Sequence, residues 1–397
     1  MKLAQAVQGI APSGIRRFFD VVSQMDDVIS LGVGEPDFGT AWRVREAAIY
    51  GLERGRTTYT TNQGLLELRQ AVGGHLRRRL GLDYDPETQI LITVGVSEAL
   101  DLALRALLDP GDEVIVPQPC YVAYAPCVVL AGGVPVPLTT GPETSFIPRP
   151  EDVTALITPR TRALLLNYPN NPTGAAPTHA QLHALAAVAR RHDLVVISDE
   201  IYDRLSYERE HIAVPSLPGM AERTLLLNGF SKTYGMTGWR VGYATGPADL
   251  IAAMGKIHQY TALCAGRGAQ EAAIEALRVP DRDVQAMVDD YDARRRIIVA
   301  GLNRIGLPCH LPAGAFYAFP SIAPTGLSSQ EFAERLLYEA HVAVVPGEAF
   351  GAGGAGHVRC AYATALPRIE EALERIDRFV QSLTPASQPH VANAIVG

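Results

Sequence analysis

The chain is poor in lysine, in cysteine motifs and in long apolar segments. Only Lys2, Lys232 and Lys256 are lysines among the 35 basic residues, and the others are arginines. The five cysteines form no Cys-x-x-Cys pair, which argues against a disulfide framework and a zinc site and indicates a reducing compartment. No apolar run approaches the roughly 20 residues of a membrane span, and residues 1–19 are too polar for a signal peptide. We therefore expect a soluble, cytoplasmic protein without a metal site.

The charge pattern does not favour nucleic acid as a partner. The formal net charge is −7, and the only short basic runs are the arginines at 77–79 and 294–296. Both runs lie in polar, helix-like surroundings, so we interpret each as a solvated helix face. With 397 residues, of which 47% are hydrophobic, the chain can bury a large core or the cores of two domains.

Short apolar runs alternate with helical patterns along the first part of the chain. Strands are expected at 89–94, 112–117, 162–168, 194–199 and 224–230, and the helices between them include 97–108, 121–131 and 179–192. Because the apolar runs lack polar–apolar alternation, we expect strands that are buried on both faces and joined by crossover helices. The sequence predicts an α/β fold with three layers around a mostly parallel sheet.

A second α/β unit is expected towards the carboxyl terminus. Long helices are predicted at 247–257, 262–278 and 284–305, followed by β-like segments at 314–321, 342–346 and 357–364 and helices at 328–340 and 367–383. We expect a large domain over residues 46–285 and a smaller α/β domain formed by residues 1–45 and 286–397.

One glycine-rich motif is not interpreted as a nucleotide site. Residues 351–356, GAGGAG, satisfy G-x-G-x-x-G, but the segment that follows is strand-like. A dinucleotide fingerprint has to follow a strand and open a helix. We therefore expect a loop at this position.

Lys232 is the first candidate for chemistry. Arginine stays protonated at any working pH, whereas a desolvated lysine amine can lose its proton and attack a carbonyl. A chain that otherwise uses arginine has a lysine here, between a serine and a threonine in a glycine-rich run. Lys232 is a candidate Schiff-base nucleophile, and the alternative is an ordinary surface lysine.

Three other segments carry candidate groups that ordinary folding chemistry also explains. Asp199 ends a predicted strand, where α/β sheets place their ligands, but aspartate also caps helices. The N–H groups of Val96 and Ser97 would suit a phosphate, although Ser97 would also serve as a helix cap. The turn at 164–174, LLLNYPNNPTG, is explained by turn chemistry alone.

Taken in order, these segments resemble the fold-type I, aspartate-aminotransferase-like family of pyridoxal-phosphate enzymes. The matching segments are SLGVGEPDF (30–38), TTYTTNQGLLELR (57–69), PCYVAY (119–124), NYPNNPTG (167–174), SDEIY (198–202), FSKTYGMTGWRVGY (230–243) and VRCAYAT (358–364). The resemblance covers nearly the whole chain. Segments 13–22 and 256–260 are most similar to bacterial aminotransferases for aromatic amino acids or for N-acetyl-diaminopimelate.

The resemblance implies that the cofactor is pyridoxal 5′-phosphate and assigns residues to it. Lys232 would hold the cofactor as a Schiff base and later move the proton at the substrate's Cα. Asp199 would pair with the pyridine nitrogen, so that the ring can accept electrons. Tyr202 and Asn171 would hydrogen-bond the phenolic oxygen, which lowers the pKa of the imine, and Tyr121 would stack on the ring.

The resemblance also implies a phosphate site that two subunits share. Its members in the same chain would be Ser231, Arg240 and the N–H groups of Val96 and Ser97. Tyr59 would reach this phosphate from the neighbouring subunit. We therefore expect a homodimer with shared active sites.

The substrate-binding residues are implied in the same way. Arg359 would clamp the α-carboxylate together with the backbone at Gly34 and with Asn171, and Ile15 would form an apolar wall. Many aspartate-type relatives have a lysine where this chain has Ser97. Arg267 is either a replacement cation near the partner's active site or a solvent-facing residue.

These assignments imply an aminotransferase. It would move the amino group of an L-amino acid, aromatic, N-acetyl-diaminopimelate-like or aspartate-like, to 2-oxoglutarate by a ping-pong mechanism. The alternative is a pyridoxal-phosphate-dependent β-lyase or synthase acting on a sulfur amino acid. A cofactor-binding regulator would need an extra helix-turn-helix domain, which we do not expect because the aminotransferase pattern begins within the first twenty residues. A nicotinamide dehydrogenase is disfavoured by the surroundings of residues 351–356.

Overall fold

The computed structural model describes residues 3–10 and 25–383, and its largest sheet has seven strands in the order β2-β8-β7-β6-β5-β3-β4. The strands are β2 (Ile90–Thr93), β3 (Glu113–Gln118), β4 (Val134–Thr139), β5 (Thr161–Asn167), β6 (Val195–Asp199), β7 (Thr224–Gly229) and β8 (Gly242–Thr245). The five strands from β4 to β7 in this order run parallel, and β8 is antiparallel to both of its neighbours. The predicted mostly parallel sheet is confirmed.

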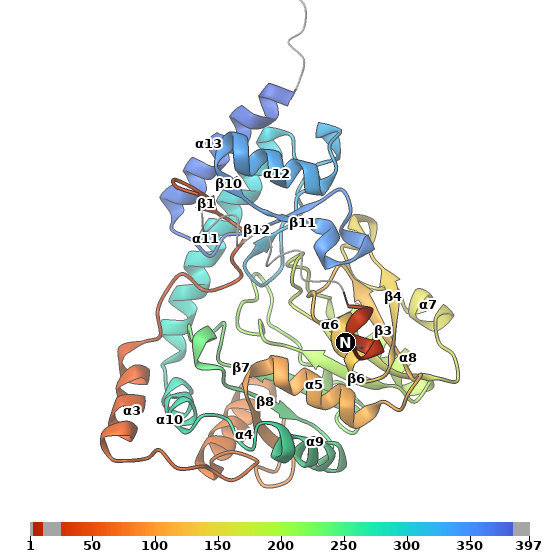
Figure 1. Cartoon of the computed structure of the whole chain (residues 1–397), viewed down its shortest axis with the longest axis vertical. Coiled ribbons are helices and arrows are strands. Elements are labelled where there is room, and N and C mark those ends of the chain that lie inside the picture. Colours follow the sequence, from red (N-terminus) through yellow and green to blue (C-terminus); the bar gives the residue numbers. More distant parts are fainter. Residues whose placement is uncertain (1–2, 11–24, 384–397) are drawn as a thin grey trace, which may run out of the picture.

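Helices cover both faces of this sheet (Figure 1). One face is covered by α5 (Gly95–Leu107), α6 (Tyr124–Leu130) and α9 (Ala248–Thr261), and the other by α4 (Leu66–Leu80), α7 (Pro150–Ala155), α8 (His179–Arg191) and α10 (Arg267–Ala276). Along β5, Leu165 packs on the first face and its neighbour Leu164 on the second. Successive side chains of a strand point to opposite faces, so strands buried on both faces have continuous apolar runs. The three-layer α/β prediction is confirmed.

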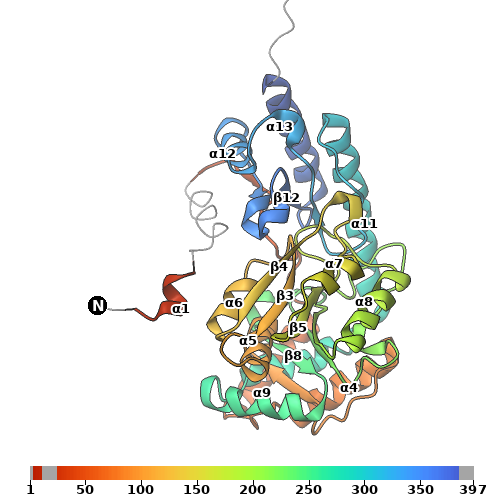
Figure 2. The same cartoon turned by 90° about the vertical axis from the view of Figure 1, so that its right-hand side faces the viewer.

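The carboxyl-terminal part has its own small sheets and core. Figure 2 shows α12, α13 and β12 of this part at the end of the molecule away from α9. The strand β1 (Ile29–Ser30) pairs in parallel with β10 (Val342–Ala343), and β12 (Val358–Ala361) lies between β11 (Val345–Pro346) and β9 (Tyr317–Ala318). The helices α11 (Asp281–Ile305), α12 (Ser329–Ala340) and α13 (Leu366–Leu383) contribute to this core. The remaining α-helices within residues 3–10 and 25–383 are α1 (Gln5–Gln8) and α3 (Trp42–Glu53), and α3 packs on α10.

The predicted domain limits stay a prediction. The limit between residues 285 and 286 falls inside α11, which is one continuous helix from Asp281 to Ile305. That helix runs from the level of the large sheet to the carboxyl-terminal sheets in Figure 1. No described helix is long and apolar enough to cross a membrane.

Two expectations about helices need correction. The arginines at 77–79 are exposed at the end of α4, as expected, but the run at 294–296 is not a solvated face. Arg295 is 1% exposed, because its guanidinium group contacts the carboxylates of Asp292 and Glu208 and lies over the ring of Tyr207. In α5 the N-cap position is Val94, so Ser97 lies inside the first turn and does not cap the helix.

The motif at 351–356 has the structure expected of a loop. It contains a short 3-10 turn at Ala352–Gly354 and leads directly into β12. A helix that would receive a pyrophosphate does not follow the glycines. The interpretation as a dinucleotide site is therefore excluded at this position.

Candidate active site

A cavity of about 480 Å³ lies at the carboxyl ends of the parallel strands. It contains all the predicted site residues apart from Tyr59 and Ile15, namely Gly34, Val96, Ser97, Tyr121, Asn171, Asp199, Tyr202, Ser231, Lys232, Arg240 and Arg359. Ile15 lies outside the described residues. The strand ends bring these groups together because parallel strands all end at the same edge of the sheet.

Lys232 follows the end of β7 and points into this cavity. Its Nζ donates a hydrogen bond to the carbonyl oxygen of Gly34 at 2.7 Å. Burial lowers the pKa of Lys232 to about 8, although the nearby carboxylate of Glu35 opposes this shift. The rings of Tyr202 and Phe316 lie 5.8 Å and 5.9 Å from the amine. Desolvation of this kind provides the neutral amine that nucleophilic chemistry requires.

Asp199 is the last residue of β6 and is buried. Its Oδ2 accepts a hydrogen bond from the hydroxyl of Tyr124 at 2.8 Å, and its Oδ1 accepts one from the N–H of Ile201 at 3.2 Å. Burial raises the pKa of Asp199 to about 6, and the bond from Tyr124 opposes this shift. A turn follows Asp199 and not a helix, so the carboxylate is not a helix cap. It is a buried, oriented acceptor for a cationic group.

The amino terminus of α5 and Arg240 form a candidate anion site. The first N–H groups of a helix have no partner within it, so the start of α5 favours negative charge. Gly95 begins this helix with a φ of +74°, and a Cβ there would lie 2.7 Å from Nη2 of Arg240. Arg240 also donates from Nη1 to the carbonyl of Thr237 at 2.9 Å. Only glycine permits this approach of a guanidinium group to the helix terminus.

Arg359 lies on β12, lines the same cavity and is buried. Its Nη1 donates to Oδ1 of Asn171 at 2.9 Å, and its Nη2 donates to the carbonyl of Gly32 at 2.6 Å. Among the described residues its buried Nε has no hydrogen-bond partner. A buried donor without a partner is costly. This guanidinium group therefore has an unused donor that a carboxylate can satisfy.

Two tyrosines of the cavity were missed by the sequence analysis. Tyr124, which donates to Asp199, was predicted only as part of a helix, and Tyr317 only as part of a strand. The hydroxyl groups of Tyr317 and Tyr202 lie 2.7 Å apart. A Cβ at Gly34 would lie 2.6 Å from the Tyr317 hydroxyl oxygen, so a larger residue at this position would displace the Tyr317 side chain. Tyr124 lies in the matching segment 119–124, which was the available signal for it, whereas Tyr317 lies in none of the matching segments.

Tyr59 and Arg267 lie outside the cavity. Tyr59 is 79% exposed, in the segment between α3 and α4. Arg267 begins α10 and donates to Oγ1 of Thr58 at 3.1 Å and to Oε1 of Glu271 at 3.3 Å. These bonds connect Arg267 to the segment that carries Tyr59.

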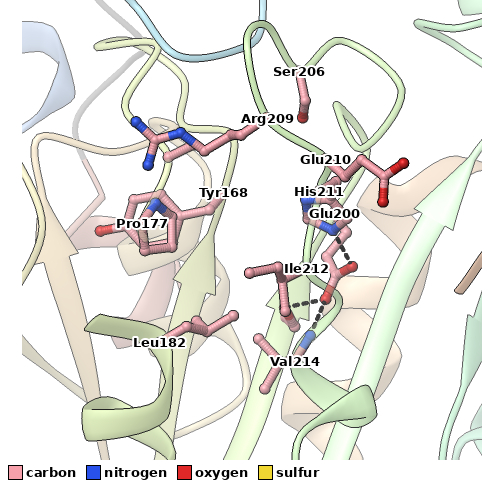
Figure 3. Close-up of a pocket in the computed structure, with 12 residues that line it drawn as sticks. Tyr168, Pro177, Leu182, Glu200, Ser206, Arg209, Glu210, His211, Ile212 and Val214 are labelled. Carbon is pink, nitrogen blue, oxygen red and sulfur yellow. Dashed lines mark hydrogen bonds and ion pairs between the residues drawn. The ribbon is translucent and has the colours of Figure 1, made fainter. Parts of the chain in front are cut away.

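A smaller cavity of about 20 Å³ contains none of the predicted site residues (Figure 3). Glu200 follows Asp199 directly and points to the opposite side of the sheet, where its Oε2 lies 2.6 Å from Nε2 of His211. Its Oε1 accepts from the N–H of Val214 at 3.0 Å. Burial lowers the pKa of His211, but the carboxylate of Glu200 outweighs this and raises the pKa overall. Both carboxylate oxygens of Glu200 therefore have partners within the chain.

Comparisons with known proteins agree with this geometry. A family model described as aminotransferase class I and II matches residues 26–376. The chain is 50% identical over 382 residues to the putative aminotransferase YugH of Bacillus subtilis (strain 168), covering 96% of this chain and 99% of the relative. It is 44% identical over 385 residues to aromatic-amino-acid aminotransferase 2 of Thermococcus litoralis, with coverage of 96% and 99%. The structure of the Thermus thermophilus aspartate aminotransferase with maleate superposes with a TM-score of 0.90 at 42% identity, covering 95% and 99% of the two chains.

Proposed function

Because the chain belongs to the family of class I and II aminotransferases, we propose that its cavity binds pyridoxal 5′-phosphate and an L-amino acid. The amino group is transferred to 2-oxoglutarate in a ping-pong reaction. One observation carries the proposal. A lysine with a lowered pKa, a buried aspartate, an anion site and an arginine with an unused donor line the same cavity.

The residues of the cavity fit the chemical groups of this cofactor. Lys232 would hold its aldehyde carbon, Asp199 would pair with the protonated pyridine nitrogen, and the start of α5 with Arg240 would hold the phosphate. Ser231 lies beside Lys232 in the same wall and would add a hydroxyl donor. When bound, the cofactor acts as an electron sink for the carbanion formed at the substrate's Cα.

The residues of the chain bind and orient the substrate around that carbon. The Nε of Arg359, which has no partner among the described residues, would receive the α-carboxylate. Because Oδ1 of Asn171 accepts from Arg359, the Nδ2 of the same amide is the group left to donate towards the cofactor's phenolic oxygen. The pKa of Lys232 is lowered to about 8, so its neutral amine would accept the proton of the substrate's Cα and move it during the transfer.

We propose that aromatic or other long amino acids are better donors than aspartate. The names of the relatives do not identify the amino donor of this chain, since they include both aromatic and aspartate aminotransferases. Ser97 leaves the cavity without the lysine that an acidic side chain would use. Burying an aromatic ring would contribute roughly 2–3 kcal/mol, whereas a carboxylate would lose hydration without a partner.

We also propose that the active site is completed by a second copy of the chain. Tyr59 is a large, 79% exposed side chain that lies outside the cavity of its own subunit. Other exposed aromatic residues, Trp42 and Tyr50, lie on the neighbouring helix α3. A homodimer would cover this surface and allow Tyr59 to contact the phosphate in the partner subunit.

The proposed function is tested by following the cofactor and the amino group. Borohydride should fix the cofactor's mass on the peptide that contains Lys232, and labelled nitrogen from the donor should appear in glutamate when 2-oxoglutarate is added. Release of the nitrogen as free ammonia would support a β-lyase instead, which the names of the relatives do not favour. Modification of another peptide, or of none, would refute the proposal.

A further inference from the structure

Tyr317 contacts two other residues that line the cavity, Tyr202 and Arg359. It lies on β9, is buried, and its hydroxyl is 2.7 Å from the hydroxyl of Tyr202. The guanidinium carbon of Arg359 lies 4.6 Å from the centre of the Tyr317 ring. Neither contact belongs to the roles proposed above. We infer that Tyr317 is a positioning residue whose hydroxyl donates to Tyr202 and whose ring holds the guanidinium group of Arg359 in place.

The direction of the hydrogen bond follows from the number of protons available. Burial raises the pKa of both Tyr202 and Tyr317, so both hydroxyls keep their protons. This inference rests on the proposed function, in which Tyr202 gives its single proton to the cofactor's phenolic oxygen. Tyr202 then has only lone pairs left for Tyr317, so Tyr317 is the donor in this pair. A donor that itself accepts a hydrogen bond is polarised and becomes a stronger donor.

The ring of Tyr317 acts on Arg359 in a different way. Both terminal nitrogens of the guanidinium group are used, by Asn171 and by the carbonyl of Gly32. The ring lies against the same group, and a cation above an aromatic face is attracted by its electron density. A second ring, that of Phe350, lies 4.9 Å from the guanidinium carbon. The rings and the two acceptors fix the plane of the group, so its Nε keeps one direction towards the cavity.

Two substitutions at this position separate the hydroxyl from the ring. Tyr317→Phe removes the hydrogen bond and keeps the ring, while Tyr317→Leu removes both. Tyr362→Phe is the control, because Tyr362 is also fully buried and its hydroxyl donates to the carbonyl of Ala315 at 3.1 Å, away from Tyr202. Each protein is loaded with pyridoxal 5′-phosphate without substrate, and its visible absorbance is titrated with pH. Binding of 3-phenylpropanoate, a carboxylic acid without an amino group, is measured in the same proteins.

The pH midpoint of the visible absorbance and the affinity for 3-phenylpropanoate should respond differently to the two substitutions. Tyr317→Phe should raise the pH midpoint of the visible absorbance by about 0.5 to 1 unit, because a weaker donor leaves more charge on the phenolic oxygen. Its affinity for 3-phenylpropanoate should stay within about twofold of the parent, whereas Tyr317→Leu should bind the acid about five- to tenfold more weakly. Tyr362→Phe should change neither value.

Each contrary result has a distinct meaning. If the parent protein shows no visible band that borohydride fixes on Lys232, the proposed function fails and this inference fails with it. If the parent titrates normally and Tyr317→Phe has the same midpoint, the role of the hydroxyl is refuted alone. Equal losses of acid binding in Tyr317→Phe and Tyr317→Leu would refute the role of the ring. A shift in Tyr362→Phe as large as that in Tyr317→Phe would show a general structural effect and overturn the inference.

Discussion

The cavity is lined by two groups of residues, the sheet end and the opposite end, which are built in different ways. At the sheet end, Asp199 is the last residue of β6 and Lys232 follows the neighbouring strand β7. The opposite end consists of Gly34, from a segment near the amino terminus, and of Tyr317 and Arg359, which lie on the paired strands β9 and β12. The first end is positioned by the seven-stranded sheet, and the second by a loop and two short strands of a separate small sheet. This contrast suggests that the sheet end determines the type of reaction and the other end determines which substrate fits.

The largest expected effect tests the sheet end. Lys232→Ala should lower the rate of amino-group transfer by at least about 10⁴-fold, because it removes both the covalent attachment and the base. The protein should still retain cofactor without a covalent bond, since the anion site and Asp199 remain. Transfer rates and retained cofactor are measured together. Lys256→Ala is the control because Lys256 is exposed on α9, and an equal loss there would contradict the assignment.

Asp199→Asn tests the partner of the pyridine nitrogen. A neutral amide cannot stabilise a positive charge on the ring, so kcat should fall by about 10²- to 10³-fold in a folded protein. Asp193→Asn changes an aspartate that is exposed next to β6 and should be close to the parent in kcat. Steady-state kinetics and thermal unfolding separate the two effects. Near-parent activity of Asp199→Asn would show that Asp199 has only a structural role.

The pH dependence of lysine modification compares the cavity with the surface. Only the neutral amine reacts with a carbonyl, and burial lowers the pKa of Lys232 to about 8. At pH 8 about half of the Lys232 side chains are therefore neutral, against roughly 1 in 300 for a lysine with the ordinary value of 10.5. Reductive methylation of cofactor-free protein with formaldehyde and cyanoborohydride should label Lys232 with a midpoint near pH 8. A midpoint near the ordinary value of 10.5 would disprove the shift.

Mixing two inactive variants tests whether a second subunit completes the site. If Tyr59 reaches the partner's phosphate, a heterodimer of Tyr59→Ala and Lys232→Ala has one site without either defect. After random exchange of equal amounts, about half of the dimers would be heterodimers. Because one of the two sites in each heterodimer is intact, about a quarter of all active sites would be functional. Activity is assayed after subunit exchange has been demonstrated by mass. No recovery would indicate that each site is built from a single chain.

The smallest expected effect concerns Arg267 and the substrate end. Its guanidinium group is already bonded to Thr58 and Glu271. Arg267→Ala should therefore change the ratio of kcat/KM for aspartate to that for tyrosine by less than about threefold. A large loss for acidic donors alone would show that Arg267 binds their side chains, and our preference for aromatic donors would be wrong.

The sequence predicted the sheet end better than the opposite end, for physical reasons. The strands at 194–199 and 224–230 match β6 and β7 within a residue, because strands buried on both faces leave continuous apolar runs. The strand β4 was missed because its Val134–Thr139 segment contains two prolines and lies at the edge of the sheet. The strand β8 has only four residues and gives a weak signal.

Side-chain contacts between distant segments were not predictable. The bond from Tyr124 to Asp199 joins residues 75 positions apart, and that between Tyr202 and Tyr317 joins residues 115 apart. Local patterns predict a helix or a strand at these tyrosines, but only the tertiary structure gives their partners. The burial of Arg295 was missed for the same reason, because Glu208 and Tyr207 lie on another segment.

The helix α11 has a mechanical consequence for the cavity. Its 25 residues form a continuous beam of about 38 Å, with a rise of 1.5 Å per residue. Near its middle, Tyr291 and Arg294 bond both carboxylate oxygens of Asp37, three residues after Gly34. Residues of the same helix pack in the core beneath the carboxyl-terminal sheets. The helix therefore ties the segment that carries Gly34 to that core.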